Sequence, residues 1–270
     1  MVRAVVVGAG GRMGRRIVHT ILQTSGIGLA GAVERDGHPA VGQDVGDLAG
    51  EGSVGVVVGS DLSRVVDKAE VILDFTAPEV SLKSLEIGAE HHRAIVIGTT
   101  GFSPDQMERV RDLGPRTRCV MAPNMSVGVN VMFKIVEEMA RVLGKDYDVE
   151  VIEAHHRFKK DAPSGTAMRL GEAIAGVLGQ DLETVGVWGR KGLVGERKAT
   201  EIGVHAVRAG DIVGDHTVIF GGVGERLEVT HRAHSRDNFA RGAVKAALWV
   251  VDRPNGLYDM QDVLDLRGKG

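Results

Sequence analysis

Several features are scarce in this chain of 270 residues, and each scarcity excludes a class of protein. The single cysteine, Cys119, cannot form an intramolecular disulfide, so nothing in the sequence requires an oxidising compartment. The 33 basic and 36 acidic side chains give a net charge of -3, which excludes a strongly basic nucleic-acid binder. No apolar run approaches the roughly 18 residues of a membrane span, and the run after Arg3 is too short for a secretory signal. We therefore expect a cytoplasmic protein that binds neither nucleic acid nor a membrane.

Glycine is abundant by contrast, with 38 residues, and the aliphatic residues come in short runs. Through the first half of the chain these runs alternate with helical periodicity, which predicts an α/β fold with a doubly wound parallel sheet of Rossmann type. The expected strands are residues 2–7, 29–34, 54–58, 71–75, 94–98 and 118–122. The expected helices are residues 12–24, 78–90 and 104–113, of which the last two open with proline.

The pattern changes near residue 126. Expected helices at residues 129–143 and 166–178 accompany strands at 149–154, 201–209, 216–221 and 226–231, and the last three strands follow one another without helices between them. This spacing predicts a second, α+β domain with a mixed sheet over residues 127–236, after a first domain of residues 1–126. From the pattern alone, a final helix at 239–251 and the rest of segment 237–270 fit either domain.

A glycine turn joins the first expected strand to the first expected helix: Gly8, Ala9, Gly10, Gly11, Arg12, Met13 and Gly14. Backbone N–H groups at such a helix start can hold the pyrophosphate of a dinucleotide, although a tight turn without a ligand also explains the glycines. Glu34 follows about 20 residues later, where an acidic side chain can accept hydrogen bonds from ribose hydroxyls. Arg35 could pair with a 2′-phosphate, so the doublet suits both NADH and NADPH and favours neither.

Two further segments follow the fifth and sixth expected strands. They are Gly98, Thr99, Thr100 and Gly101, and then Ala122, Pro123, Asn124 and Met125. Ligands of open α/β sheets bind at the carboxyl edge of the strands. We therefore expect both segments to flank the nicotinamide.

The stretch from Glu153 to Ala167 carries the remaining chemistry. It contains His155, His156, Arg157, Lys159, Ser164, Gly165 and Thr166. Ser164 is a good N-cap, and the N–H groups at the start of the following helix can bind a carboxylate beside a proton-donating histidine. Adjacent histidines on a strand point to opposite faces, so one of them at most is expected to be catalytic. No metal is expected, because neither a nearby cysteine nor a metal-binding histidine spacing is present, and Cys119 is expected in the core.

These motifs resemble the dihydrodipicolinate reductase family of the diaminopimelate–lysine pathway, and the resemblance runs along the whole chain. Beyond the segments above, it is carried by Asp74-Phe75-Thr76, Ser126-Val127-Gly128-Val129-Asn130, the segment from Arg208 to Gly214, and Gly224-Glu225-Arg226. The chain departs from the family pattern at Lys160, where valine is common, and at Met125, where phenylalanine is common. Neither position has a catalytic role in the family.

The resemblance implies an oxidoreductase that reduces 4-hydroxy-tetrahydrodipicolinate to tetrahydrodipicolinate with NADH or NADPH. It implies that His155 is the proton donor and Lys159 the second catalytic residue, with the substrate held by His156, Ser164, Gly165 and Thr166. The implied cofactor-binding residues are Gly8, Ala9, Gly10, Gly11, Arg12, Met13, Glu34, Arg35, Gly98, Thr99, Thr100, Ala122, Pro123, Asn124 and Met125. It also implies a homotetramer built by the second domain, and a C-terminal segment 237–270 that packs back onto the first domain.

Two rival interpretations stay open on the sequence alone. One is another Rossmann-type dehydrogenase of a small carboxylic acid, whose nucleotide-binding half would have the same pattern. The other is a protein that senses NAD(H) without turnover. The stretch at 153–167 distinguishes the reductase from the other dehydrogenases. A sensor of NAD(H) predicts that cofactor binding is unaffected by a cyclic diacid such as pyridine-2,6-dicarboxylate.

Overall fold

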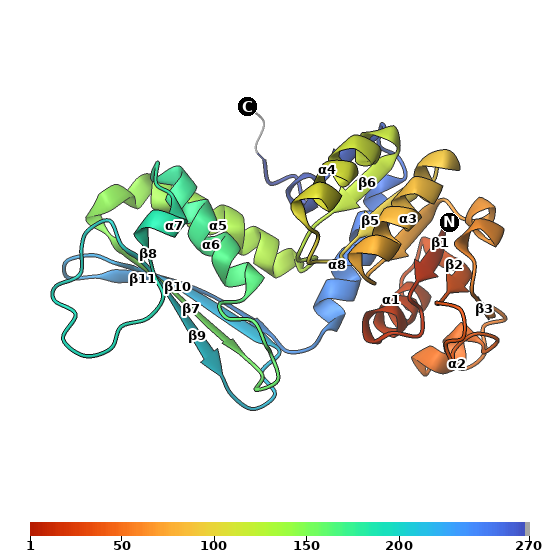
Figure 1. Cartoon of the computed structure of the whole chain (residues 1–270), viewed down its shortest axis with the longest axis horizontal. Coiled ribbons are helices and arrows are strands. Elements are labelled where there is room, and N and C mark those ends of the chain that lie inside the picture. Colours follow the sequence, from red (N-terminus) through yellow and green to blue (C-terminus); the bar gives the residue numbers. More distant parts are fainter. Residues whose placement is uncertain (268–270) are drawn as a thin grey trace. The chain divides into compact units, whose positions relative to one another are not determined.

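The computed structural model describes residues 1–267 and divides into two compact units (Figure 1). Unit 1 comprises Met1–Val127 together with the segment that begins at Arg236, and unit 2 comprises Gly128–Ser235. The last three residues of the segment 237–270 considered above lie outside the described part of the chain. Each unit has its own hydrophobic core and is described by itself.

Unit 1 is built on a seven-stranded sheet in which every pair of neighbouring strands is parallel. The strand order is β12-β6-β5-β4-β1-β2-β3. The strands are β1 (Val2–Val7), β2 (Ile27–Val33), β3 (Val58–Gly59), β4 (Val71–Asp74), β5 (Ala94–Ile97), β6 (Arg118–Met121) and β12 (Gly256–Tyr258). The order reverses direction at β1, which is the place where open α/β sheets bind their ligands. The predicted Rossmann-type sheet is therefore confirmed.

Helices cover both faces of this sheet, as its aliphatic strands require. They are α1 (Arg12–Leu22), α2 (Val45–Ala49), α3 (Pro78–Glu90), α4 (Pro104–Leu113), α8 (Asp237–Val250) and α9 (Met260–Val263). Val6 and Leu73 point into a core formed with α1 and α8, whereas Val5 and Ile72 point into a second core formed with α3 and α4. Because successive strand residues alternate between two buried faces, neither face could be polar. Cys119 is fully buried in the second core, as expected.

The sequence interpretation was wrong about one strand and incomplete about another. Of the strand expected at 54–58, only Val58 lies in β3. The carboxylate of Asp44 accepts hydrogen bonds from the N–H groups of Val54 and Gly55 and holds these two residues in a loop, and Val57 forms only an isolated bridge with Asp44. The same carboxylate caps α2 through Gly46. At the other edge of the sheet, β12 adds a seventh strand beside β6. The sequence pattern did not predict it, because Gly256–Tyr258 is too short to show strand periodicity.

Unit 2 is a five-stranded mixed sheet in the order β11-β10-β7-β9-β8. Its strands are β7 (Asp148–His155), β8 (Gly186–Val187), β9 (Ile202–Arg208), β10 (Gly214–Gly221) and β11 (Arg226–Ala233). Its helices are α5 (Val127–Leu143), α6 (Gly165–Val177) and α7 (Leu182–Val185), and α5 and α6 pack their apolar side chains on one face of the sheet. The opposite face leaves Ile152 and Val207 exposed, at 37% and 44% of their surface. The predicted α+β mixed sheet is confirmed.

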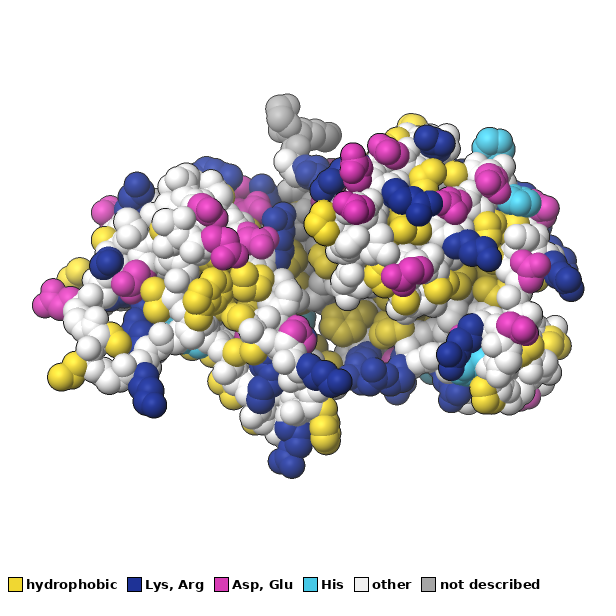
Figure 2. All heavy atoms as spheres, viewed as in Figure 1, with side chains coloured by type: hydrophobic (Ala, Val, Ile, Leu, Met, Phe, Trp, Pro, Cys, Tyr) yellow, Lys and Arg dark blue, Asp and Glu magenta, His cyan; other side chains and the backbone are white. Residues whose placement is uncertain are grey.

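The surface of unit 1 carries charges of both signs. On the face that Figure 2 presents, acidic and basic side chains alternate without a large area of one sign, in keeping with the small net charge. Within residues 1–267, no helix has the length and apolar character needed to cross a membrane.

Candidate functional site

The glycine turn between β1 and α1 has a backbone that only glycine fits at two positions. Gly8 has a φ of 72°, in the left-handed region, and a Cβ there would lie 2.5 Å from the Thr76 side chain. A Cβ on Gly14 would lie 2.1 Å from the Gly8 carbonyl oxygen, because α1 starts directly against the end of β1. The N–H of Gly11 donates to that same oxygen at 2.9 Å and closes the turn. The result is an exposed helix start with no side chain over its backbone N–H groups, which fits a dinucleotide pyrophosphate.

Glu34 stands directly after β2 and faces this turn. Its Oε2 accepts a hydrogen bond from the Gly10 N–H at 3.1 Å, and its Oε1 accepts one from the Arg35 N–H at 3.0 Å. These bonds fix the carboxylate beside the glycines while leaving each oxygen a further lone pair for a hydroxyl donor. The position is the one where a ribose is held in dinucleotide-binding sheets.

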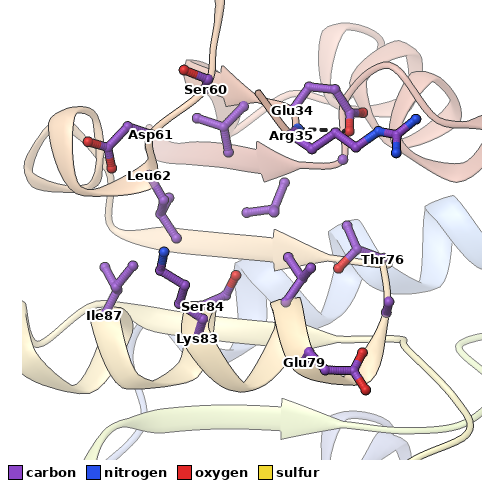
Figure 3. A pocket seen from close by; sticks show the side chains of 15 residues that line it. Glu34, Arg35, Ser60, Asp61, Leu62, Thr76, Glu79, Lys83, Ser84 and Ile87 are labelled. Atoms are coloured by element: carbon purple, nitrogen blue, oxygen red, sulfur yellow. Dashed lines mark hydrogen bonds between the residues drawn. The ribbon is translucent and has the colours of Figure 1, made fainter. Parts of the chain in front are cut away.

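A cavity of about 560 Å³ opens between the end of β2 and helix α3 (Figure 3). In Figure 3, Glu34 and Arg35 lie on one side of it, and Thr76 and Glu79 lie on the other. Its walls are mainly apolar, from Val7, Val33, Leu62, Val80 and Ile87. An apolar slot with a carboxylate and a guanidinium at one end suits a flat heterocycle attached to a ribose.

A second cavity, of about 280 Å³, lies on the other side of the glycine turn. Six expected cofactor-binding residues line it: Arg12, Met13, Gly98, Pro123, Asn124 and Met125. Phe75, Arg236 and Phe239 complete the lining and were not among the expected residues. A Cβ on Gly98 would lie 2.0 Å from the Phe75 ring, so glycine is required for the ring to pack there.

The side chains of the other expected residues of unit 1 do not line these two cavities. Ala9 and Ala122 are buried core residues. The hydroxyls of Thr99 and Ser81 lie 2.7 Å apart, and Ser81 donates in turn to Asp74. Thr100 lines a separate cavity of about 510 Å³ together with Phe102 and Tyr258.

Asp74 ends β4 and is completely buried. Its carboxylate accepts hydrogen bonds from the backbone N–H and the hydroxyl of Thr76 and from the hydroxyl of Ser81. Burial raises the pKa of Asp74 above its ordinary value despite these bonds. The residue therefore shapes the turn from β4 into α3, next to Gly8.

In unit 2, His155 ends β7 and contacts a buried carboxylate. Its Nδ1 lies 2.6 Å from Oε2 of Glu153, a side chain with no exposed surface. An ionised carboxylate can only accept, so Nδ1 carries a proton and Nε2 is the nitrogen left for exchange with a ligand. Burial lowers the pKa of His155, although Glu153 opposes this effect. A histidine in such a setting is a stronger acid than a free one.

Glu153 stays ionised because several donors surround it. Burial pushes its pKa upward, but hydrogen bonds from Arg208, His155 and Ser164 outweigh burial and hold the pKa below its ordinary value. The Ser164 N–H donates to Oε1 at 2.9 Å. Through that bond the strand end that carries His155 is joined to the start of α6.

The start of α6 is shaped by Ser164, its N-cap. The Ser164 hydroxyl oxygen accepts from the Ala167 N–H at 3.2 Å and lies 3.1 Å from Nε2 of His216. Burial lowers the pKa of His216 to about 3, so this ring is neutral near pH 7. Gly165 is the first residue of the helix and is exposed, and a helix start of this kind favours a carboxylate.

The loop between β7 and α6 brings further charge to this cluster. Lys159 Nζ lies 2.9 Å from the carboxylate of Asp161, and its side chain is 22% exposed. Nδ1 of His156 is buried and lacks a hydrogen-bond partner, and its ring packs against Phe158. Among the residues that the structure describes, no group of three or more His, Cys, Asp or Glu side chains is arranged to hold a metal ion.

The sequence interpretation missed Glu153, Arg208, Arg236 and Phe239. Glu153 and Arg208 stand in separate motifs. The pairing of β7 with β9 places Arg208 beside His155, and from there its guanidinium reaches Glu153. Arg236 and Phe239 precede or begin a helix that the pattern assigned to neither domain. The one sequence feature that could have pointed to these residues is the aromatic side chain in the first turn of that helix.

The two units match known proteins in sequence. Residues 2–125 match the family model described as dihydrodipicolinate reductase, N-terminus, and residues 128–264 match the model described as dihydrodipicolinate reductase, C-terminus. The chain is 57% identical over 267 residues to a 4-hydroxy-tetrahydrodipicolinate reductase from Syntrophus aciditrophicus, covering 99% of this chain and 100% of the relative. It is 54% identical, with the same coverage, to the enzyme of that name from a Geobacter species.

A solved structure resembles the whole chain as well. It is the dipicolinate-bound dihydrodipicolinate reductase from Paenisporosarcina sp. TG-14, with a TM-score of 0.74 and 27% sequence identity, covering 97% of this chain and 98% of that one. An amine dehydrogenase from Mycobacterium smegmatis, at 18% identity and a TM-score of 0.59, shares the fold. From the two family models and the full-length relatives it follows that this chain belongs to the dihydrodipicolinate reductase family of NAD(P)H-dependent oxidoreductases in lysine and diaminopimelate biosynthesis.

Proposed function

We propose that this protein reduces 4-hydroxy-tetrahydrodipicolinate to tetrahydrodipicolinate with NADH or NADPH, and that His155 donates the proton. The observation that carries the proposal is the buried contact between His155 and Glu153, beside a lysine and a helix start that suit a dicarboxylate. Family membership supplies the substrate class, and the geometry supports the roles that we propose for the residues.

Unit 1 is proposed as the dinucleotide-binding unit. Gly8, Gly10 and Gly14 leave backbone space that side chains would fill, since a Cβ on Gly10 would lie 2.8 Å from both His38 and Ala40. Glu34 would accept hydrogen bonds from the ribose, and Arg35 would face a 2′-phosphate. The cavity lined by Met13, Asn124 and Met125 would take the nicotinamide, together with Gly98 and Phe239. When bound there, a reduced nicotinamide would supply the hydride.

Unit 2 is proposed as the substrate-binding unit. Loss of water from the 4-hydroxylated substrate gives a conjugated imine. Addition of a hydride to that imine leaves an electron-rich enamine, which must gain a proton at carbon, so the net change is one hydride and one proton gained and one water lost. His155 would deliver that proton from Nε2 while Glu153 holds Nδ1. Lys159 would neutralise one substrate carboxylate, and the N–H groups at the start of α6, shaped by Ser164, would hold the other.

The remaining substrate contacts are proposed on the same basis. His156 lies next to the proton donor and has a buried nitrogen without a partner, so it can bind a carboxylate or ring nitrogen. Gly165 and Thr166 belong to the first turn of α6, and glycine at the first position lets a ligand approach the backbone closely. Lys160 is exposed and is given no role.

We further propose that the protein is a cytoplasmic homotetramer assembled through the open face of the unit 2 sheet. The exposed Ile152 and Val207 on that face support an interface between copies. Sedimentation equilibrium gives the mass directly. Replacing Ile152 with lysine is expected to reduce the mass and leave the circular dichroism unchanged, whereas an unchanged mass would assign the contact to another surface.

The test of the reaction is oxidation of NADH and NADPH by purified protein, with the substrate generated in place by the preceding synthase from pyruvate and aspartate semialdehyde. Oxidation that depends on the synthase is the expected result. If a protein that binds NADH and pyridine-2,6-dicarboxylate causes no oxidation, the proposed turnover is wrong. Binding of NADH without the diacid would favour the nucleotide-sensing alternative.

A further inference from the structure

The segment from Arg208 to Gly214 joins β9 to β10 and contains none of the residues proposed to bind or protonate the substrate. Arg208 ends β9, and strand register places it directly beside His155 at the end of β7. Gly214 begins β10 on the other side of His155, and a Cβ there would lie 3.0 Å from the Nε2 of that ring. Both ends of the segment therefore contact the proposed proton donor or its immediate surroundings.

Arg208 forms a two-pronged ion pair with Glu153. Its Nη1 lies 2.8 Å from Oε2 and its Nη2 lies 2.8 Å from Oε1, so both prongs of the guanidinium are bonded to the carboxylate. Oε2 also accepts from His155, and Oε1 from the backbone of Ser164. All four donors converge on a side chain with no exposed surface, and removing one of them leaves part of a buried charge unpaired.

The same guanidinium reaches the loop that carries Lys159. Nη2 of Arg208 donates to the carbonyl oxygen of Asp161 at 2.7 Å, and Nη1 donates to the carbonyl oxygen of Val207 at 2.7 Å. The carboxylate of Asp161 in turn pairs with Lys159 at 2.9 Å. One arginine is thus connected to both proposed catalytic side chains, through Glu153 to His155 and through Asp161 to Lys159.

We infer that the Glu153–Arg208 pair is a positioning device that sets the orientation of the His155 ring and the place of Lys159 together. The inference rests on the proposed function, in which these two residues act on the substrate. We class neither member of the pair as a catalytic residue, because both carboxylate oxygens of Glu153 and both Nη atoms of Arg208 are bonded within the protein.

The charges around His155 determine how each member acts on its protonation. Glu153 stabilises the protonated ring, whereas Lys159 and Arg208 disfavour it, and the neighbouring His216 is neutral. Asp161 lies beyond Lys159 and Arg208. A general acid loses activity as pH rises through its pKa. On a plot of kcat against pH, this loss is the alkaline limb of the profile. Removing Glu153 should shift the alkaline limb to lower pH, and removing the charge of Arg208 should shift it to higher pH.

The experiment compares the pH dependence of kcat in Glu153→Gln, Arg208→Met and Arg208→Lys. We expect kcat to fall at least about tenfold in all three. The limb should move in opposite directions in the first two and stay in place in Arg208→Lys, which keeps the charge but loses the fork. Arg169→Met is the matched control, because that arginine is exposed and pairs with Glu172 on the same helix.

A second readout does not depend on turnover. In protein with 15N-labelled histidine, NMR reports which ring nitrogen of His155 carries the proton. The affinity for pyridine-2,6-dicarboxylate reports whether Lys159 is in place to bind a carboxylate. We expect Glu153→Gln to mix the two tautomers and Arg208→Lys to weaken diacid binding severalfold. Unmoved limbs and an unchanged His155 spectrum, with only a lower Tm, would overturn the inference. If His155→Gln keeps full activity, the proposed proton donor fails, while the tautomer result still decides the positioning role.

Discussion

The glycine turn of unit 1 and the Glu153 cluster of unit 2 prepare for their ligands by opposite means. The turn has no buried ionised side chain: its shape comes from a left-handed Gly8 and from contacts too close for any Cβ at Gly14. The cluster is made of side chains, with a fully buried carboxylate between an arginine and a histidine. The first site is therefore sensitive to added volume, and the second to a change of charge.

The contrast follows from what each site must bind. A pyrophosphate is already ionised, and backbone N–H groups at a helix start are sufficient to hold it. Protonation of carbon, however, requires an acid whose tautomer and pKa are set by its neighbours. Substitutions that change one property at a time can separate the two sites.

The largest effect is expected from His155→Gln, which keeps a similar volume but cannot donate the proton. We expect kcat to fall about 10²–10⁴-fold with little change in KM, because the missing interaction belongs to the transition state. Lys159→Ala should instead damage both kcat and KM, since it also removes a carboxylate contact. Steady-state kinetics with both cofactors measures the two parameters.

A matched histidine outside the cluster tests whether the loss is specific. His91 caps the end of α3 and pairs with Asp67 at the surface of unit 1. His91→Gln should leave kcat and KM unchanged. An unchanged kcat in purified His155→Gln would show that His155 is not the proton donor. The Glu153 cluster would then have no catalytic role to set against the glycine turn.

The next largest effect is expected from volume alone, in Gly14→Ala. The added Cβ would lie 2.1 Å from the Gly8 carbonyl oxygen, so α1 must move away from β1. Overpacking of this kind costs about 1–3 kcal/mol, and it should also weaken NADH binding because the helix start is displaced. Thermal unfolding and a fluorescence titration with NADH measure the two losses.

Gly59→Ala is the control for this substitution. Gly59 ends β3, and a Cβ there meets nothing within 4 Å. Its stability and NADH affinity should match those of the unsubstituted protein. Equal behaviour of the two alanine variants would mean that the turn tolerates side chains and that its glycines are not required.

The same contrast explains which features could be predicted from the sequence. The strand, glycine turn and helix of unit 1 are local, so spacing alone located Gly8, Glu34 and the carboxyl ends of β5 and β6. The strand expected at 54–58 was placed too early, because the side chain of Asp44, about ten residues earlier, takes the N–H groups of Val54 and Gly55 and leaves only Val58 in β3. The local pattern of apolar residues carries no information about such a bond.

In unit 2 the sequence located the proposed substrate residues but not what holds them. His155, Lys159 and Ser164 lie within one short segment, so a motif could contain them. Arg208 is 55 residues from Glu153 and meets it only through the pairing of β7 with β9. Phe239 reaches its cavity from a helix more than 100 residues beyond the glycine turn, and no periodicity predicts that return.

A smaller effect is expected at the outer part of the dinucleotide site. Arg35 is exposed beside Glu34, where its charge would favour a 2′-phosphate. Arg35→Ala should raise KM for NADPH about tenfold and leave KM for NADH nearly unchanged. Arg111→Ala, an exposed arginine on α4, is the control and should change neither value. Equal losses with both cofactors would assign Arg35 to the adenine and not to the phosphate.

The smallest effect is expected from low pH on protein stability. It tests whether a charge cluster of unit 2 outside the substrate site also stabilises the fold. Burial raises the pKa of Glu150, but hydrogen bonds from Arg190, His205 and Arg197 outweigh burial and lower the pKa from 4.5 to about 2. A carboxyl whose pKa is depressed by folding stabilises the protein above its ordinary pKa, and this contribution is lost as pH falls toward the folded value. Stability contributed by Glu150 should therefore decline between about pH 4.5 and about pH 2.

Glu150→Gln lacks this titration. Its Tm should be lower than that of the unsubstituted protein near neutral pH, and the two Tm values should converge by a few degrees, roughly 2–4 °C, on acidification. Sedimentation at both pH values keeps assembly from being mistaken for folding. Glu172→Gln is the control, because Glu172 pairs with Arg169 at the surface of α6 and such pairs contribute little. If Glu150→Gln loses Tm in acid as steeply as the unsubstituted protein, the ion cluster around Glu150 does not stabilise unit 2, and charge matters there only at the substrate site.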